Sequence, residues 1–213
     1  MSWLSSLWQR PRRRHDEPLD ALRERGFIAI DLETTGLDPR RDRIVAVAAV
    51  KFIEDKSVPE LITFVNPGHS IPESATRIHG IDDAMVTGAP DEATAVERLD
   101  AIIANEVVVG HGVAFDVAVL ARVRGAVSAG RAPRAVLCTQ WLAASLYPGW
   151  PDCSLETVCA RFGVAVERRH TADGDARMAG RLLLELLPPL QQRGIRTLAD
   201  ALWFQDAAGR LAR

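Results

Sequence analysis

Residues 27–38 read FIAIDLETTGLD, an apolar run that carries two acidic residues and then breaks into a turn. Apolar and β-branched residues predict a buried strand over residues 27–33. Asp31 and Glu33 are two positions apart, so on a strand both side chains leave the same face, roughly 6.6–7 Å apart. Burying a carboxylate without a partner is unfavourable. Either the two acids bind something or they lie at a solvated strand end, and the pair alone leaves both interpretations open.

The rest of the chain places this strand in a sheet. Short connections join it to apolar runs at residues 43–52 and 60–66, which predicts an antiparallel meander. Further strands at residues 106–111 and 134–139 alternate with helices. The predicted helices cover residues 91–105, 115–126, 139–147, 154–162 and 171–187. This order predicts an α/β fold, with a mixed five-stranded sheet and helices on both faces. Pro188 and Pro189 predict the end of the last long helix.

Composition excludes several classes of protein. The 213 residues are 47% hydrophobic and 25% charged, which is typical of a globular domain and excludes wholesale disorder. No apolar run approaches the ~20 residues of a membrane span, so we do not expect an integral membrane protein. Three cysteines without zinc-type spacing indicate a reducing compartment, and we expect a cytoplasmic location. The net charge of -2 shows no global basic field, although a metal site can supply local positive charge to a nucleic acid.

Two more acids lie where α/β sheets place ligands. Asp116 follows the strand at residues 106–111, in the first turn of a helix, where an acid also suits the helix dipole. Asp175 begins the last long helix, and His170 precedes it in a loop. Thr171 can cap that helix, so an ordinary polar helix start is the alternative there.

These acids become informative as a set. If Asp31, Glu33, Asp116 and Asp175 converge, each close pair repels by about 4 kcal/mol at 4 Å and an effective dielectric near 20. Either they do not converge, or cations neutralise them. Ligands that are all oxygens select hard ions, so the site predicts Mg²⁺ or Mn²⁺ rather than zinc.

Four motifs in order carry a family resemblance. They are DLETTGLD at 31–38, NPGHSIPESATRIHGIDDAMVTGAP at 66–90, HGVAFDVAVL at 111–120 and HTADGDA at 170–176. In this order and spacing the chain resembles the DnaQ-like 3′-to-5′ exonucleases of the DEDDh type, the family of the proofreading epsilon subunit of bacterial DNA polymerase III. The resemblance spans about residues 26–187 and implies a ribonuclease-H-like fold.

The resemblance also implies roles for individual residues. Two divalent cations would be bound by Asp31, Glu33, Asp116 and Asp175. His170 would be the general base. The sister type has a tyrosine at the position of Thr171, so His170 decides the type to which this chain is similar. The implied substrate contacts are Thr34, Thr35, Leu37, Ile78, His79 and His111. For His111 a strand-end hydrogen bond is an equal alternative, and the segment RIHG also suits a helix C-cap.

Two positions depart from the family pattern. Gly112 stands where the family commonly has asparagine, and Ala46 where it often has glutamate. Neither is one of the five implied catalytic positions.

The implied activity is removal of nucleoside 5′-monophosphates from the 3′ end of single-stranded nucleic acid, with DNA favoured. The alternatives are the same chemistry on RNA or short oligoribonucleotides and, from another class, a non-catalytic docking module. We expect an exonuclease domain at residues 17–190, a flexible Trp/Arg-rich leader at 1–16 and a short helical tail at 191–213. The leader or the tail could bind a polymerase or another protein partner.

Overall fold

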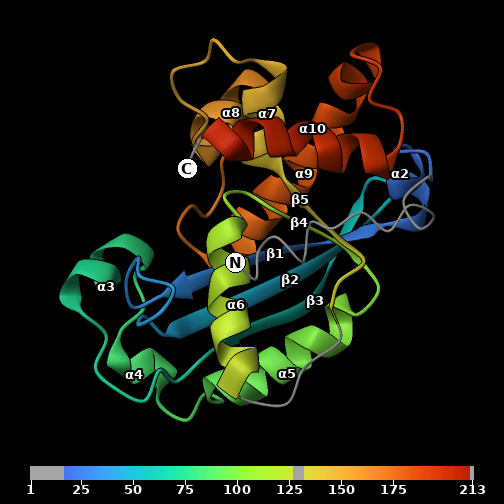
Figure 1. Cartoon of the computed structure of the whole chain (residues 1–213). Helices are drawn as coiled ribbons and strands as arrows, with labels where there is room; N and C mark the ends of the chain where they lie inside the picture. The colour runs from blue at the N-terminus through green and yellow to red at the C-terminus, as the bar shows by residue number, and fades with distance from the viewer. Residues whose placement is uncertain (1–16, 127–131, 212–213) are drawn as a thin grey trace.

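The computed structural model describes residues 17–126 and 132–211 (Figure 1). A five-stranded sheet has the order β3-β2-β1-β4-β5. The strands are β1 (Phe27–Thr34), β2 (Ile44–Ile53), β3 (Lys56–Phe64), β4 (Val107–Gly110) and β5 (Ala135–Cys138). β1 pairs antiparallel with β2 and parallel with β4. The predicted mixed five-stranded α/β fold is therefore confirmed, and its third strand lies at Lys56–Phe64 rather than at residues 60–66.

Helices cover both faces of the sheet (Figure 1). They are α2 (Ala21–Arg25), α3 (Glu73–His79), α4 (Asp83–Val86), α5 (Glu92–Ile103), α6 (Ala114–Ala126), α7 (Thr139–Leu146), α8 (Leu155–Arg161), α9 (Ala172–Gln192) and α10 (Leu198–Leu211). α9 packs on one face against β1 and β2, whereas α5 and α6 contribute to the apolar cluster on the other face. No helix in the described ranges is long and apolar enough to cross a membrane.

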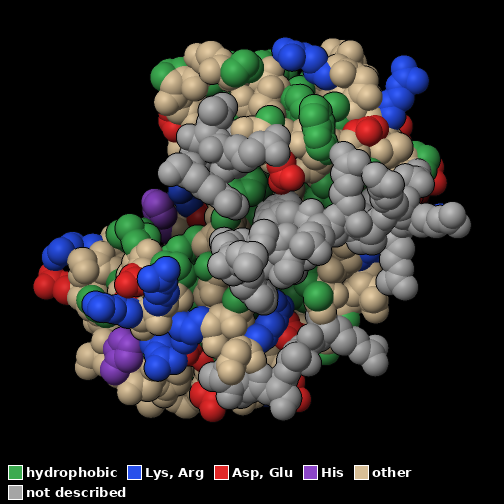
Figure 2. Space-filling model, viewed as in Figure 1, with side chains coloured by type: hydrophobic (Ala, Val, Ile, Leu, Met, Phe, Trp, Pro, Cys, Tyr) green, Lys and Arg blue, Asp and Glu red, His purple; other side chains and the backbone are tan. Residues whose placement is uncertain are grey.

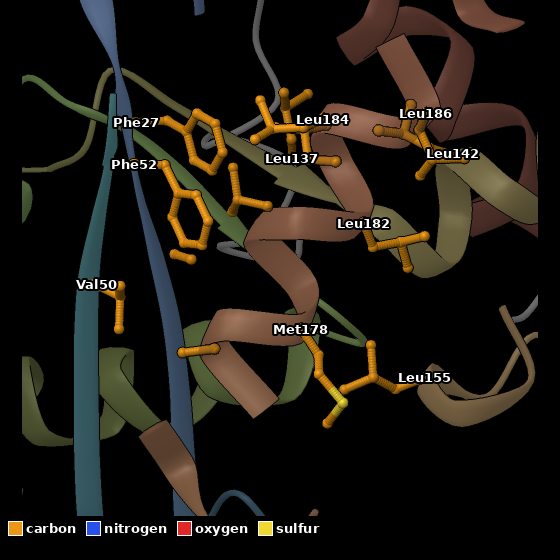
Figure 3. Packing of buried hydrophobic residues seen from close by; sticks show 14 of the residues in the cluster. Phe27, Val50, Phe52, Leu137, Leu142, Leu155, Met178, Leu182, Leu184 and Leu186 are labelled. Carbon is orange, nitrogen blue, oxygen red and sulfur yellow. The ribbon is translucent and has the colours of Figure 1, made fainter. Parts of the chain in front are cut away.

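Strand alternation decides which face each β1 side chain takes. Phe27 and Ala29 belong to the apolar cluster on the α9 side, whereas Ile28 and Ile30 belong to the cluster on the α5–α6 side. Figure 3 shows Phe27 and Phe52 beside Leu184 of α9, and the two rings are stacked at 5.1 Å. Because side chains alternate along a strand, the acids at odd positions of β1 face α9.

The expected end of the last long helix at Pro188 is wrong. α9 runs on to Gln192 with both prolines inside it. A proline at position 188 cannot donate to the carbonyl four residues earlier, which is that of Leu184. That carbonyl instead accepts a hydrogen bond of 3.2 Å from the Arg23 guanidinium, so the helix continues without leaving a buried acceptor unpaired.

α10, the helix after α9, packs in the core and is hydrogen-bonded to the sheet. Leu198 and Ala201 of α10 belong to the core. The fully buried amide of Gln205 accepts from the Cys138 backbone N–H at 2.8 Å and donates to the Val136 carbonyl at 2.9 Å. A side-chain amide thus satisfies the outer edge of β5 as a further strand would. The expected leader, residues 1–16, lies outside the described residues.

Candidate active site

Three carboxylates converge on the α9 face of the sheet. Asp31 and Glu33 come from β1 and Asp175 from the first turn of α9, and their ligand oxygens all lie within 4.8 Å of one another. Close approach of α9 to the sheet requires Gly180, because a Cβ there would overlap the Phe52 ring. The two strand acids are partly exposed and Asp175 is buried, so the cluster opens to solvent on one side.

Asp116 reaches β1 from the helix that follows the C-terminal end of β4. It is buried in the first turn of α6, and its carboxylate accepts a 2.9 Å hydrogen bond from the Leu32 backbone N–H. That bond holds it between the two strand acids along the chain. The charge of Asp116 raises the pKa of Asp31, and the charge of Glu33 raises the pKa of Asp116, so the fourth acid belongs electrostatically to the cluster.

The four carboxylates resist ionisation. Burial raises the pKa of Asp31 well above its usual range, and the neighbouring acids add to the rise. Burial, followed by the charge of Asp175, raises the pKa of Glu33 to about 7. Burial also raises the pKa of Asp116 to about 7. A cluster of carboxylates with raised pKa values favours a bound cation, since the cation stabilises the charged form that burial disfavours.

The donor set fits a divalent metal. All the nearby ligand atoms are carboxylate oxygens, which hard cations prefer. The Oδ1 atom of Asp175 is buried and has no hydrogen-bond partner. A buried carboxylate oxygen that is left unpaired is unfavourable, and a metal ion would satisfy it.

Arg169 enters the site and was not among the residues predicted from the sequence. Its guanidinium forms ion pairs with Asp175 and, at 2.5 Å, with Glu156 of α8. It opposes the rise in pKa of Asp31, Glu33 and Asp175. The only signal in the sequence is its place directly before His170, and a run of charged residues in a loop is ordinarily solvated.

His170 lies at the mouth of the cluster on a strained loop. Its side chain is exposed, and its backbone has a φ of 60°, a conformation that non-glycine residues rarely adopt. The charge of His170 and its backbone amide both lower the pKa of Asp175, against the rise that burial causes. Thr171 caps α9 as expected, accepting from the Gly174 N–H at 3.2 Å. The imidazole is therefore beside the carboxylates and open to water.

The turn after β1 is rigid around an exposed apolar tip. Thr34 and Thr35 are buried, and the Thr35 hydroxyl donates to Asp42 at 3.2 Å. Gly36 is required there, because a Cβ would contact the Asp42 carboxylate at 2.5 Å. The side chain of Leu37, in contrast, is 87% exposed.

α3 brings two further predicted residues to this turn. His79 is buried and lies next to the Thr34 backbone, whereas Ile78 is 57% exposed. The Nδ1 of His79 accepts from the Ile81 N–H at 3.0 Å, and its Nε2 is buried without a partner. Gly80 ends α3 with a φ of 74°, so the segment RIHG is a helix C-cap, the alternative that the sequence offered for it.

His111 is held by the protein on both sides. Its Nδ1 lies 2.9 Å from the Thr139 hydroxyl and its Nε2 lies 2.9 Å from the Cys153 carbonyl. Burial lowers the pKa of His111 to about 4, so the ring is neutral and donates through Nε2. This geometry favours the strand-end hydrogen bond over a substrate contact.

The two departures from the family pattern have local explanations. Gly112 has a φ of 68°, and glycine and asparagine are the residues that adopt this conformation most readily. Ala46 is the register partner of Glu33, so a glutamate there would add a carboxylate beside the cluster. The chain therefore keeps the backbone at the first position and removes a charge at the second.

Comparison with known proteins places the chain in a family. The model of the exonuclease family RNase_T matches residues 28–183, which include all four acids and His170. This chain belongs to that exonuclease family. The DnaQ-like resemblance and the hydrolytic nuclease activity predicted from the sequence are thereby confirmed.

Named relatives of this exonuclease are much longer chains. A DNA polymerase III subunit epsilon-like protein of Rhodobacter capsulatus is 36% identical over 203 residues, covering 93% of this chain and 28% of that protein. A PolC-type DNA polymerase III of Oceanobacillus iheyensis is 31% identical over 174 residues, covering 82% of this chain and 12% of that protein. The exonuclease thus spans less than a third of the length of either relative.

Solved structures share the fold. Exonuclease X in complex with 5′ overhanging duplex DNA has a TM-score of 0.62 at 25% identity, covering 83% of this chain and 97% of that chain. E. coli exonuclease I in complex with a dT13 oligonucleotide has a TM-score of 0.63 at 20% identity, covering 79% of this chain and 42% of that chain. The ribonuclease-H-like fold of this exonuclease is therefore confirmed.

Proposed function

We propose that this exonuclease removes nucleoside 5′-monophosphates from the 3′ end of single-stranded DNA. The observation that carries the proposal is the convergence of Asp31, Glu33 and Asp175 within 4.8 Å, with His170 at the open side. Asp31, Glu33, Asp116 and Asp175 would hold two divalent ions, with Asp31, Glu33 and Asp175 as the ligands that already converge. Such ions, when bound, stabilise the charge that develops on the phosphate.

The protein's own groups would handle the proton and the terminal nucleotide. An exposed imidazole beside the cluster suits His170 to take a proton from the attacking water. Leu37 and Ile78 present exposed apolar side chains close to Thr35 and His79 in the sequence, and there they would pack against the terminal base. His79 lies against the Thr34 backbone with its Nε2 buried, so it would shape the wall of the pocket for the terminal nucleotide.

Surface charge supports a nucleic-acid substrate despite the net charge of -2. Figure 2 shows Lys and Arg side chains gathered over the part of the surface around α3, at the left of the view. Exposed arginines on α3 and on the turn after β1 are Arg40, Arg41, Arg43 and Arg77. Arginine suits phosphate contacts. DNA is favoured over RNA because one relative named above is a PolC-type DNA polymerase III and the other is named as similar to the epsilon subunit of DNA polymerase III.

The test uses single-stranded DNA and RNA of matched sequence, each labelled at the 5′ end, with Mg²⁺ or Mn²⁺. We expect a ladder of labelled DNA shortened stepwise from the 3′ end, abolished by EDTA and by Asp175→Asn. Immediate release of a labelled mononucleotide would refute the direction. A ladder confined to RNA would refute the substrate, and no ladder on either would favour the docking module.

We also propose a protein partner, by analogy with the polymerase components named above. The leader lies outside the described residues. In the tail, Gln205 holds the inner face of α10 on β5, so only the outer face, with Trp203 55% exposed, is open to a partner. Deletion of residues 1–16 and, separately, Trp203→Ala should leave hydrolysis of free oligonucleotides unchanged. Co-purification of a polymerase with the full chain that survives both changes would refute these recruitment sites.

A further inference from the structure

Arg169 makes contacts that the proposed reaction does not use. Its guanidinium lies between acids of two different helices, Asp175 of α9 and Glu156 of α8. The Arg169 side chain is 26% exposed and that of Asp175 only 8%. The guanidinium is therefore part of the wall of the carboxylate cluster and is not a solvated surface charge.

Arg169 lies beside the oxygens that could hold a metal ion. It is paired with Asp175, whose ligand oxygen lies within 4.8 Å of those of Asp31 and Glu33. The Arg169 guanidinium and a divalent cation would therefore be attracted by the same carboxylates and would compete for them. The contact with the Asp175 Oδ2 also uses a ligand oxygen directly, leaving Oδ1 as the unpaired one.

We propose that Arg169 is an internal counter-cation of the cluster that competes with the divalent metal. This inference rests on the proposed function, because it takes the cluster as the metal site. Glu156 is the second acid that this competition requires. With Asp175 engaged by a metal ion, Arg169 keeps a partner 2.5 Å away and does not have to become solvated.

The loop that carries Arg169 also carries His170. Arg168 and His170 both have a positive φ, 49° and 60°, so the backbone on either side of Arg169 is in a sparsely populated conformation. The Thr171 hydroxyl closes the loop by donating to the Arg168 carbonyl at 2.6 Å. Arg169 is thus held directly before His170 by a loop whose backbone is closed on both sides.

The test measures Mn²⁺ binding by titration calorimetry, without substrate, on the full chain freed of metal at pH 8. Arg169→Gln should bind Mn²⁺ on the order of tenfold more tightly than wild type, since a competing positive charge is gone. The matched control is Arg168→Gln, which removes the same charge one position earlier. Arg168 pairs with Asp173 at 2.6 Å, outside the cluster, so its affinity should stay within about twofold of wild type.

Glu156→Gln tests the opposite direction. Without Glu156, Arg169 is left with Asp175, so the Mn²⁺ affinity should fall several-fold. Arg169→Lys keeps the charge and should stay near wild type, which preserves the test if Arg169→Gln does not fold. Equal or weaker Mn²⁺ binding by Arg169→Gln would overturn the inference alone. A wild type that does not bind Mn²⁺, or that binds it no better than Asp175→Asn, would overturn the proposed function with it.

Discussion

Removing the charge of Glu33 should stabilise the metal-free protein at high pH. Burial raises the pKa of Glu33 to about 7 from an ordinary value of 4.5. The folded protein therefore holds this proton more tightly than the unfolded chain, and stability falls as the pH rises from 4.5 through 7. The difference of 7 − 4.5 = 2.5 pKa units, at 1.36 kcal/mol per unit, corresponds to about 3 kcal/mol.

Glutamine cannot ionise and has nearly the same shape, so Glu33→Gln escapes this loss. In EDTA at pH 8.5 its free energy of unfolding should exceed that of wild type by about 3 kcal/mol. At pH 4.5 the two proteins should be nearly equal. For a chain of this size the gain corresponds to a melting temperature roughly 6–12 °C higher. Hydrolysis should be lost in the same variant, because a proposed metal ligand is gone.

The measurement is urea unfolding followed by circular dichroism at both pH values. Glu73→Gln is the control, because that side chain is 84% exposed and its ion pair is with Arg77, across one helical turn. It should change stability little at either pH. An equal gain for Glu33→Gln at pH 4.5 and 8.5, or no gain at 8.5, would refute the electrostatic reasoning. In that case the side chain contributes through packing or hydrogen bonding instead.

Three further predictions concern the proposed general base His170, the pocket for the terminal nucleotide and the outer edge of the sheet at β5. His170→Asn, which tolerates the left-handed backbone, should lower kcat at least a hundredfold with little change in KM, as steady-state kinetics on a DNA oligonucleotide would show. Leu37→Ala and Ile78→Ala should each raise KM severalfold and leave the melting temperature unchanged, because both side chains are mostly exposed. Gln205→Leu should destabilise the protein by about 2–3 kcal/mol in urea unfolding, because it leaves two buried backbone groups of β5 unpaired.

Some of this architecture follows directly from local sequence pattern. The period of two on β1 predicts that Asp31 and Glu33 share a face, and the register with β2 agrees. An apolar strand followed by a helical pattern likewise predicts that Asp116 lies at a strand-to-helix junction. The meeting of Asp175 with the strand acids needed the family motifs, since it depends on how α9 crosses the sheet.

Other features depend on contacts that no local pattern encodes. The helix continues through Pro188 because Arg23, far away in the chain, satisfies the carbonyl that proline frees. Gln205 reaches β5 across more than sixty residues. In the sequence Arg169 is one more charge in a polar loop, and its contact with the cluster depends on ion pairs with Glu156 of α8 and Asp175 of α9. Each depends on tertiary packing, which overrides local preference.

Two features reduce the negative charge at the cluster. Ala46, directly opposite Glu33, stands where the family often has glutamate, and Arg169 places a positive charge beside Asp175. Both reduce the repulsion that the fold must tolerate when no cation is bound, and both weaken the attraction for a divalent ion. Stability without metal and affinity for metal should therefore oppose one another at this site, and Arg169 is the residue at which the balance can be shifted by a single side chain.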